Sequence, residues 1–420
     1  MTPARVSVGL VFDEERWAAA VVKVQEGVDR NIGLFDEARA QADTIKPGVR
    51  VIRPFTATVN SVVAADGGHA PIEAFPFMSL GAVRVVDSSG EELFFDVIGP
   101  RDDTDKLSQR HIDERTPLGQ LMADLGNAAD SDPVRTARRK GRTGPLMLSE
   151  LSPMIPAPVR GGQRPKKPLS NGWMTVYRDL CEWAAIYNLV CYRDPTDRMS
   201  VILRDGLLRS KIFAHDYFTL MGAIINERIG QVKQRRKRDI FLVGIAKSSE
   251  VQARYALAMT LQNIFPAGQP YFAPIPMALQ EAVYQWPEYI RLPDGVDKSK
   301  GTDTPSMEDP KFNIGAMHFA RFGGEADDPV WTLDTLHWQA DRAAEILGCL
   351  LRDTEQSFPI PSYPQTLIDA DAGAQISKMD AELLRDAFLD SIGARVDPAQ
   401  RTVLDSQVLT VDYASRRYST

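Results

Sequence analysis

The sequence predicts an α/β protein in which a mixed sheet is flanked by helices, with an N-terminal helical region and long insertions. Short apolar runs, typical of buried strands, alternate with longer segments whose apolar residues recur at helical spacing. A hydrophobic content of 44% and a charged content of 25% are ordinary for a globular protein with a sizeable core. The 420 residues are enough for one large domain with insertions or for two to three smaller ones.

Strands and helices are expected in a definite order. The expected strands are 57–65, 77–86, 92–98, 199–206, 239–246, 316–322 and 331–336. Helices are expected at 13–45 (one or two helices), 115–126, 173–192, 215–232, 251–265, 339–351 and 363–389, the last broken near Gly373. The turn-rich tetrapeptide Asp87–Gly90 should join the second and third strands as a hairpin.

The composition along the chain predicts a division into three regions. We expect an N-terminal helical region at 1–50, one domain at 51–390 and a C-terminal tail at 391–420. The domain should carry insertions at about 100–170, which is partly helical and then rich in Pro, Gly and Arg, and at 266–312, where Pro, Asp, Lys and Ser predict a lid-like loop.

Bulk properties exclude several classes of protein. The formal net charge of −7 argues against a nonspecific nucleic-acid coat, although a local basic groove would still bind DNA. Three cysteines without a CxxC pair indicate a reducing compartment, and with no signal peptide or long apolar run we expect a soluble, cytoplasmic protein with no membrane partner. The histidines lack zinc-like spacing, and no Walker-type motif is present, so any ATP-driven motor would be a separate protein.

Two expected strands end on an aspartate followed by glycine. They are Asp66 in "AADGG" and Asp205 in "LRDG". Taken singly, each stretch is compatible with a plain turn, and "AADGG" also with a phosphate cradle or the first ligand of a metal site. Gly67 and Gly68 would let a DNA phosphate approach the backbone closely.

The order of elements favours a metal site. A strand ending in Asp, two antiparallel strands, a helix, a second strand ending in Asp and a C-terminal helix form the ribonuclease-H-like order. In that order the first and fourth strands pair, and Asp66 and Asp205 would repel each other unless a cation lay between them. Mg²⁺ and Mn²⁺ prefer such oxygen ligands, and two ions can activate water against a phosphodiester.

A third acid should come from the intervening helix. Glu182 lies among apolar neighbours in "DLCEWAAIY", where a buried carboxylate needs a partner or a metal. The alternative is an exposed Glu182 on a polar face with Asp179, which would then be the substitute ligand.

The segments "VVAADGGHAPI", "MSVILRDGLLRSK", "DIFLVGIAKSSE" and "SYPQTLIDAD" occur in an order that resembles NurA-domain nucleases. The resemblance covers roughly residues 55–390. Proteins of this family work with the hexameric HerA-type DNA-translocating ATPase in DNA end processing and, in some bacteria, in phage defence. The resemblance therefore implies a DNA nuclease that uses Mn²⁺ or Mg²⁺, forms a homodimer and docks on a HerA-like hexamer.

The resemblance also implies roles for particular residues. Asp66, Glu182 and Asp205 match the family's catalytic and metal-binding acids, and Tyr363 matches its tyrosine near the C-terminus. Eight positions after that tyrosine the family typically has histidine, whereas this chain has Asp371, which would serve as a further metal ligand. Asp369, on another face of the same helix, is the weaker candidate. The chain also has Gly68 where the family often has serine.

Several cations are candidates for contact with DNA or the attacking water. Lys247 follows the strand "FLVGIA" and would meet a phosphate or water, or else extend into solvent at the strand end. Basic tracts at 135–142, 164–167 and 233–238 would line a phosphate groove together. The nucleic-acid-binding candidates are Arg138, Arg139, Lys140, Arg142, Arg235 and Arg236.

Two further hypotheses compete with the nuclease. The altered positions at Gly68 and Asp371 favour a catalytically impaired adaptor that clamps DNA and regulates the partner ATPase. An actin-like or sugar-kinase ATPase shares the ribonuclease-H-like topology, but it needs a second Gly-rich phosphate loop and an adenosine motif, and neither is found.

Overall fold

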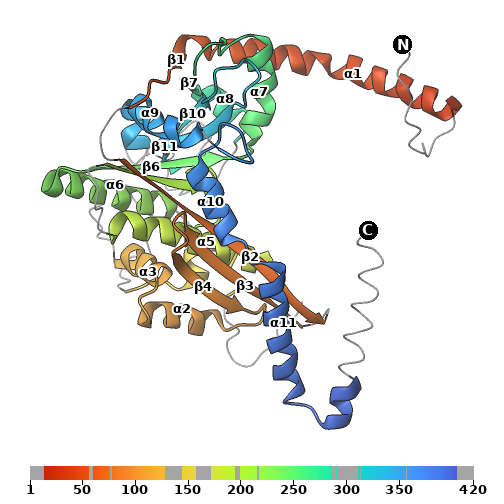
Figure 1. Ribbon diagram of the computed structural model, residues 1–420, viewed down its shortest axis with the longest axis vertical. Helices are drawn as coiled ribbons and strands as arrows, with labels where there is room; N and C mark the ends of the chain where they lie inside the picture. The colour runs from red at the N-terminus through yellow and green to blue at the C-terminus, as the bar shows by residue number, and fades with distance from the viewer. Residues whose placement is uncertain are drawn as a thin grey trace, which may run out of the picture.

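The centre of the protein is a nine-stranded mixed sheet. Figure 1 shows the computed structural model, with helices packed around the strands. The structure describes residues 14–55, 60–75, 78–127, 144–157, 172–193, 199–214, 217–284, 290–291, 311–312, 314–355 and 357–403. The strands, in spatial order, are β1 (Arg50–Val51), β7 (Tyr271–Pro274), β10 (Gly315–Arg321), β11 (Trp331–Leu336), β6 (Asp239–Ala246), β5 (Met199–Asp205), β2 (Asn60–Phe75), β3 (Met78–Asp87) and β4 (Glu92–Ile98). A separate pair, β8 (Ile290–Arg291) and β9 (Lys311–Phe312), is antiparallel.

The ribonuclease-H-like order is confirmed by the strand pairing. β2, β3 and β4 form an antiparallel meander, and β5 returns to pair parallel with β2 on its other side. β6 then pairs parallel with β5, and β11 adds to β6 in antiparallel direction. Because β2 and β5 are neighbours, residues near the carboxyl ends of their paired segments come together, as expected from the sequence.

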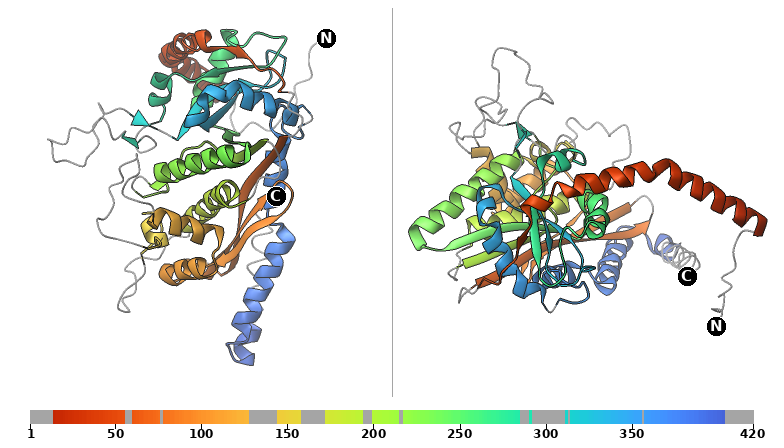
Figure 2. Two further views of the ribbon diagram at one scale, coloured as in Figure 1. Left: turned by 90° about the vertical axis from the view of Figure 1, so that its left-hand side faces the viewer. Right: turned by 90° about the horizontal axis from the view of Figure 1, so that it is seen from above.

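Helices cover both faces of this sheet (Figure 2). The helices are α1 (Glu14–Asp43), α2 (Thr104–Asp113), α3 (Pro117–Asn127), α4 (Leu148–Leu151), α5 (Gly172–Cys191), α6 (Tyr217–Arg236), α7 (Glu250–Leu261), α8 (Met277–Glu281), α9 (Ala343–Thr354), α10 (Gln365–Ala374) and α11 (Lys378–Gly393), with 3₁₀ turns η1 (Lys46–Gly48) and η5 (His337–Arg342). The long apolar helix α5 forms the centre of one core cluster, while α9 and α10 pack in a second cluster on the other face. Within the described part of the chain, no helix is long and apolar enough to cross a membrane.

Two sequence expectations about the strands are wrong. The first strand does not end at Asp66, because β2 continues through Gly67 and Gly68 to Phe75 and pairs there with β3. "AADGG" is therefore neither a turn nor a loop. Residues 266–312 are not wholly a lid-like loop either, since β7 within them pairs with β1 and β10 in the sheet.

The remaining elements lie close to their expected positions. β4, β6 and β11 have the expected bounds, and α5 begins and ends within one residue of them. The expected helix at 339–351 begins as the 3₁₀ turn η5, and the helix expected at 363–389 is divided between α10 and α11 just after Gly373.

Candidate metal centre

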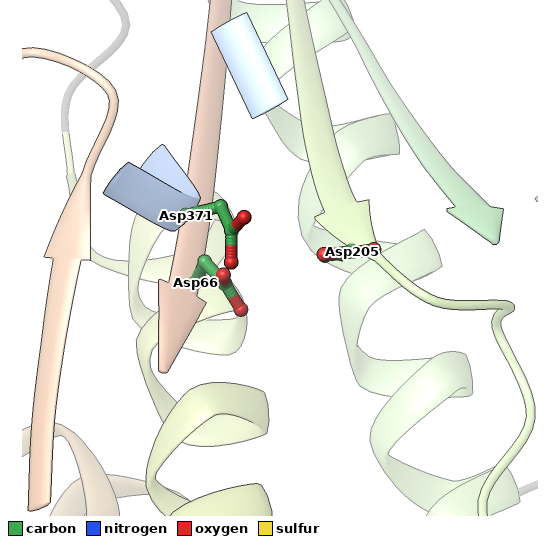
Figure 3. Close-up of side chains that lie close together, drawn as sticks. All are labelled: Asp66, Asp205 and Asp371. Carbon is green, nitrogen blue, oxygen red and sulfur yellow. The ribbon is translucent and has the colours of Figure 1, made fainter. Parts of the chain in front are cut away.

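Three aspartates from three separate elements meet on one face of the sheet. Asp66 on β2, Asp205 at the end of β5 and Asp371 on α10 each offer one carboxylate oxygen, and these oxygens lie within 4.8 Å of one another. Figure 3 shows Asp371 beside Asp66, with Asp205 across from them on the neighbouring strand. The sequence predicted that Asp66 and Asp205 lie close together, and the structure confirms this.

Strand alternation places two of these side chains on the same face. The paired segments of β2 and β5 match Ala64 with Leu203 and Ala65 with Arg204. Ala64 and Leu203 belong to the core cluster beneath α9 and α10, so Asp66 and Asp205, each two residues further along, also face α10.

Gly68 allows α10 to approach β2 closely. A Cβ at position 68 would lie 1.9 Å from the carbonyl oxygen of Ala374, the last residue of α10. At the preceding residue, the Arg84 guanidinium donates a hydrogen bond of 3.0 Å to the Gly373 carbonyl. These contacts fix the end of α10 against the sheet and thereby position Asp371 beside Asp66.

Lys247 joins the same cluster from the end of β6. Its Nζ lies 2.9 Å from Asp205 Oδ2 and 2.9 Å from Asp371 Oδ2, so the ammonium bridges two of the three carboxylates. Burial lowers the pKa of Lys247, but these two partners outweigh that effect and raise it. The reading of Lys247 as a side chain extended into solvent is therefore wrong.

Tyr363 supports Asp205 from within the core. The buried hydroxyl lies 3.3 Å from both Asp205 Oδ1 and the Ile245 carbonyl oxygen, to which it donates. The ring packs edge-on against Trp331, with centroids 4.9 Å apart. Burial and the neighbouring Asp205 raise the pKa of Tyr363 well above its ordinary value, so this side chain remains a neutral donor.

Glu182 does not belong to the group of three. It is buried in α5, on the opposite face of the sheet, where its Oε1 forms an ion pair of 2.9 Å with Arg204 Nη2. It packs against β2 at Gly67, where an added Cβ would lie 3.5 Å from Glu182 Oε2. The alternative of an exposed Glu182 is wrong, and its proposed substitute Asp179 pairs with Arg178 instead.

Two arginines that were not identified from the sequence, Arg178 and Arg204, contact Gly67 and Glu182 on this face of the sheet. Arg178 donates a hydrogen bond of 2.9 Å to the Gly67 carbonyl, and the Arg204 guanidinium stacks 4.2 Å above the Trp183 ring. A signal was present, because Arg204 adjoins Asp205 in a strand and must therefore face the other side, towards Glu182.

Burial and mutual repulsion raise the pKa of the acids. Burial, followed by the charge of Asp205, raises the pKa of Asp66 to about 6, although Gly67 N donates to its Oδ1 at 2.8 Å. Burial likewise raises the pKa of Glu182 to about 7, against the favourable charge of Arg204. The metal-free protein thus holds Asp66 in an environment that disfavours its charge.

This arrangement fits a hard divalent cation. Three carboxylate oxygens within 4.8 Å of one another are the donors that Mg²⁺ and Mn²⁺ prefer, and a cation among them would offset the repulsion that raises the pKa of Asp66. Lys247 already supplies one positive charge to the same carboxylates, so a bound cation would share them with its ammonium.

The basic candidates are not gathered at the metal centre. Arg235 and Arg236 lie at the end of α6, just before β6 begins at Asp239. Asp239 pairs with Met199 at the start of β5, so the two arginines lie at the opposite end of these strands from Asp205. Arg138, Arg139, Lys140 and Arg142, together with the tract at 164–167, lie outside the described residues.

The fold and the site together define a ribonuclease-H-like protein with an acidic cluster that fits a divalent cation. No protein-family model matches the chain, and no curated protein matches it.

Solved structures resemble it only distantly. The NurA nuclease from Sulfolobus solfataricus is 12% identical with a TM-score of 0.34, and the match covers 92% of this chain and 99% of that one. NurA bound to dAMP and manganese is 12% identical with a TM-score of 0.32, over 93% and 98% of the two chains. Endonuclease V from Ciona intestinalis, in complex with DNA, is 8% identical with a TM-score of 0.24, over 85% and 98%.

Proposed function

We propose that the protein is a metal-dependent DNA nuclease in which Asp66, Asp205 and Asp371 bind Mn²⁺ or Mg²⁺. The observation that supports this most directly is the convergence of three carboxylates, from β2, β5 and α10, on one face of a ribonuclease-H-like sheet. A bound cation would activate water and stabilise negative charge on a phosphodiester.

The chain's own residues have separable tasks in this proposal. Asp66, Asp205 and Asp371 hold the cation, and Tyr363 orients Asp205 through its hydroxyl. Lys247 supplies positive charge where a scissile phosphate would lie, next to Asp205 and Asp371. Glu182, the helical acid of the NurA-like motif, would have to leave Arg204 to reach a cation held by the three aspartates.

Cleavage of DNA by the purified protein tests this function. We expect Mn²⁺-dependent cleavage that falls by a factor of about 100 or more in Asp205→Asn, because one anionic ligand is lost while the size of the side chain is kept. A matched control is Asp239→Asn, at the other end of the neighbouring strand, which should cleave as the wild type does. Equal cleavage by wild type and Asp205→Asn would contradict the proposed site. Metal binding without any cleavage would favour the adaptor instead.

Removal of the lysine charge should separate metal binding from cleavage. In Lys247→Gln we expect the Kd for Mn²⁺ to fall roughly three- to tenfold, because a cation competing for the same carboxylates is lost. Cleavage at saturating Mn²⁺ should fall, since the phosphate loses a positive partner.

Calorimetric titration with Mn²⁺ measures the first effect and single-turnover cleavage the second. Lys46→Gln, whose ammonium pairs with Asp43 and not with a residue of the metal centre, serves as the control and should change neither quantity. An unchanged or weaker affinity of Lys247→Gln for Mn²⁺ would show that the ammonium does not compete with the ion.

We extend the proposal to partners by the resemblance to NurA-domain nucleases. The protein would act in the cytoplasm as a homodimer that receives DNA from a HerA-like hexameric ATPase, in end processing or phage defence. Co-purification with a HerA-like ATPase, and cleavage stimulated by its ATP hydrolysis, would test this extension.

A further inference from the structure

The N-terminal helix α1 presents an apolar stripe to solvent. Figure 1 shows α1 extending away from the rest of the molecule, and only its last turns pack against the body. Ala38 and Ala42 are buried there with residues of α7, and Gln41 accepts a hydrogen bond of 2.9 Å from the Tyr255 hydroxyl. Towards the N-terminus the helix is exposed, including the large apolar side chains of Trp17 and Val24.

The exposed and buried parts of α1 belong to one continuous stripe. The α1 stripe consists of Trp17, Val21, Val24, Val28, Asn31, Phe35, Ala38 and Ala42. Successive members are separated alternately by four and three residues, which is the 3.5-residue repeat of a helix that packs along another helix. α7 covers the C-terminal end of this stripe, and the same face continues outward for about three heptads.

The residues beside the α1 stripe favour a second copy of the same helix as its partner. The flanking positions along the exposed part are uncharged: Ala18, Ala20, Gln25, Gly27, Ile32 and Leu34. Two identical helices would therefore bring no like charges together, and the small residues allow close approach. The charged residues lie on the remaining faces, where Arg30 and Glu26 pair at 3.9 Å along the helix.

Asn31 gives this surface its self-complementarity. It is the one polar member of the stripe. Its Nδ2 donates a hydrogen bond of 2.7 Å to the Gly27 carbonyl within α1, but an apolar partner helix would still remove its Oδ1 from water at a cost. In a parallel, two-fold symmetric pair, Asn31 of one copy meets Asn31 of the other, and the two amides can hydrogen-bond. Registers in which Asn31 would face an apolar side chain are disfavoured, because each would bury a polar amide without a polar partner across the interface.

We infer that α1 is a dimerisation helix that pairs in parallel with α1 of a second copy of this chain through the α1 stripe. This deepens the proposed homodimer by naming its contact surface. It does not depend on nuclease activity, because α1 carries none of the metal-centre residues.

Two aspartate substitutions on one helix test the inference in the full-length protein. Val28 in the stripe and Val22 outside it are exposed to nearly the same extent, 55% and 52%, so each change costs the isolated helix a similar amount. Light scattering during gel filtration should show a dimer for the wild type and Val22→Asp. For Val28→Asp the dimer should be roughly 100-fold weaker or more, because each dimer would bury two carboxylates.

The variant Asn31→Cys tests whether the two α1 helices pair in parallel with position 31 of one copy opposite position 31 of the other. Since Cys181, Cys191 and Cys349 are all buried, mild oxidation should cross-link the new cysteine to its copy and give a covalent dimer. A monomeric wild type would overturn both the proposed homodimer and this inference. A dimer that survives Val28→Asp would leave the homodimer standing and overturn the surface, and a dimer without Asn31→Cys cross-linking would overturn the parallel register.

Discussion

Asp66→Asn is expected to abolish Mn²⁺-dependent cleavage of DNA while raising the free energy of unfolding of the metal-free protein. Asparagine keeps the acceptor that Gly67 N uses at 2.8 Å, but it removes the buried charge that faces Asp205 and Asp371. A pKa raised from 3.8 to about 6 corresponds to a destabilisation of about 1–3 kcal/mol when the carboxyl is charged. The variant should be more stable by a similar amount.

The sign of the pH dependence follows from the direction of this shift. Since the folded protein binds the Asp66 proton more tightly than the unfolded chain, the free energy of unfolding falls as the pH rises from about 4 to above 6. The advantage of Asp66→Asn should therefore be full above pH 6 and should vanish near pH 4.

Urea unfolding at several pH values, with and without Mn²⁺, measures both effects. Mn²⁺ should stabilise the wild type, because it binds only the folded site, and should stabilise Asp66→Asn much less. Asp369→Asn, on the same helix as Asp371 but outside the carboxylate group, is a suitable control and should behave as the wild type does. Equal stabilisation of both proteins by Mn²⁺ would show that Asp66 is not a ligand.

The sequence was sufficient for the pairing of β2 with β5 and for the proximity of Asp66 and Asp205. These depend on apolar runs and on the chain order of strands and helices, which are local signals. Strand length was not predictable at "AADGG", because a glycine pair normally marks a turn and only the tertiary pairing with β3 shows that β2 continues. Within this strand Gly67 packs against Glu182 and Gly68 packs against α10. Both neighbours come from distant parts of the chain, so the local sequence does not reveal them.

The position of Glu182 shows a further limit of sequence reasoning. Its apolar surroundings correctly predicted burial, but the order of elements does not say which face of the sheet α5 covers. Asp66 and Asp205 face α10, whereas Glu182 lies across the sheet with Arg204. The ion pair with Arg204 could be anticipated only from the alternation of β5, once Asp205 is assigned to the face of α10.

Gly68→Ala is expected to have the largest effect on stability of any single substitution near the metal centre. The added Cβ would lie 1.9 Å from the Ala374 carbonyl oxygen, a backbone atom, so α10 must move away from β2. We expect a loss of about 2–4 kcal/mol in the free energy of unfolding, because packing along α10 is lost with the contact. Serine at this position should act in the same way, because it also adds a Cβ.

Gly68→Ala should also disturb the metal centre more than Gly67→Ala does. At Gly67 an added Cβ would have its closest neighbour at 3.4 Å, an ordinary contact, so Gly67→Ala serves as the matched control on the same strand. Movement of α10 would carry Asp371 away from Asp66 and Lys247, and we expect Gly68→Ala to bind Mn²⁺ more weakly even at temperatures where it is fully folded. Thermal unfolding and calorimetric Mn²⁺ titration of the two variants provide the measurement. If Gly68→Ala were as stable as Gly67→Ala and bound Mn²⁺ equally well, α10 would not be held by its contact with Gly68.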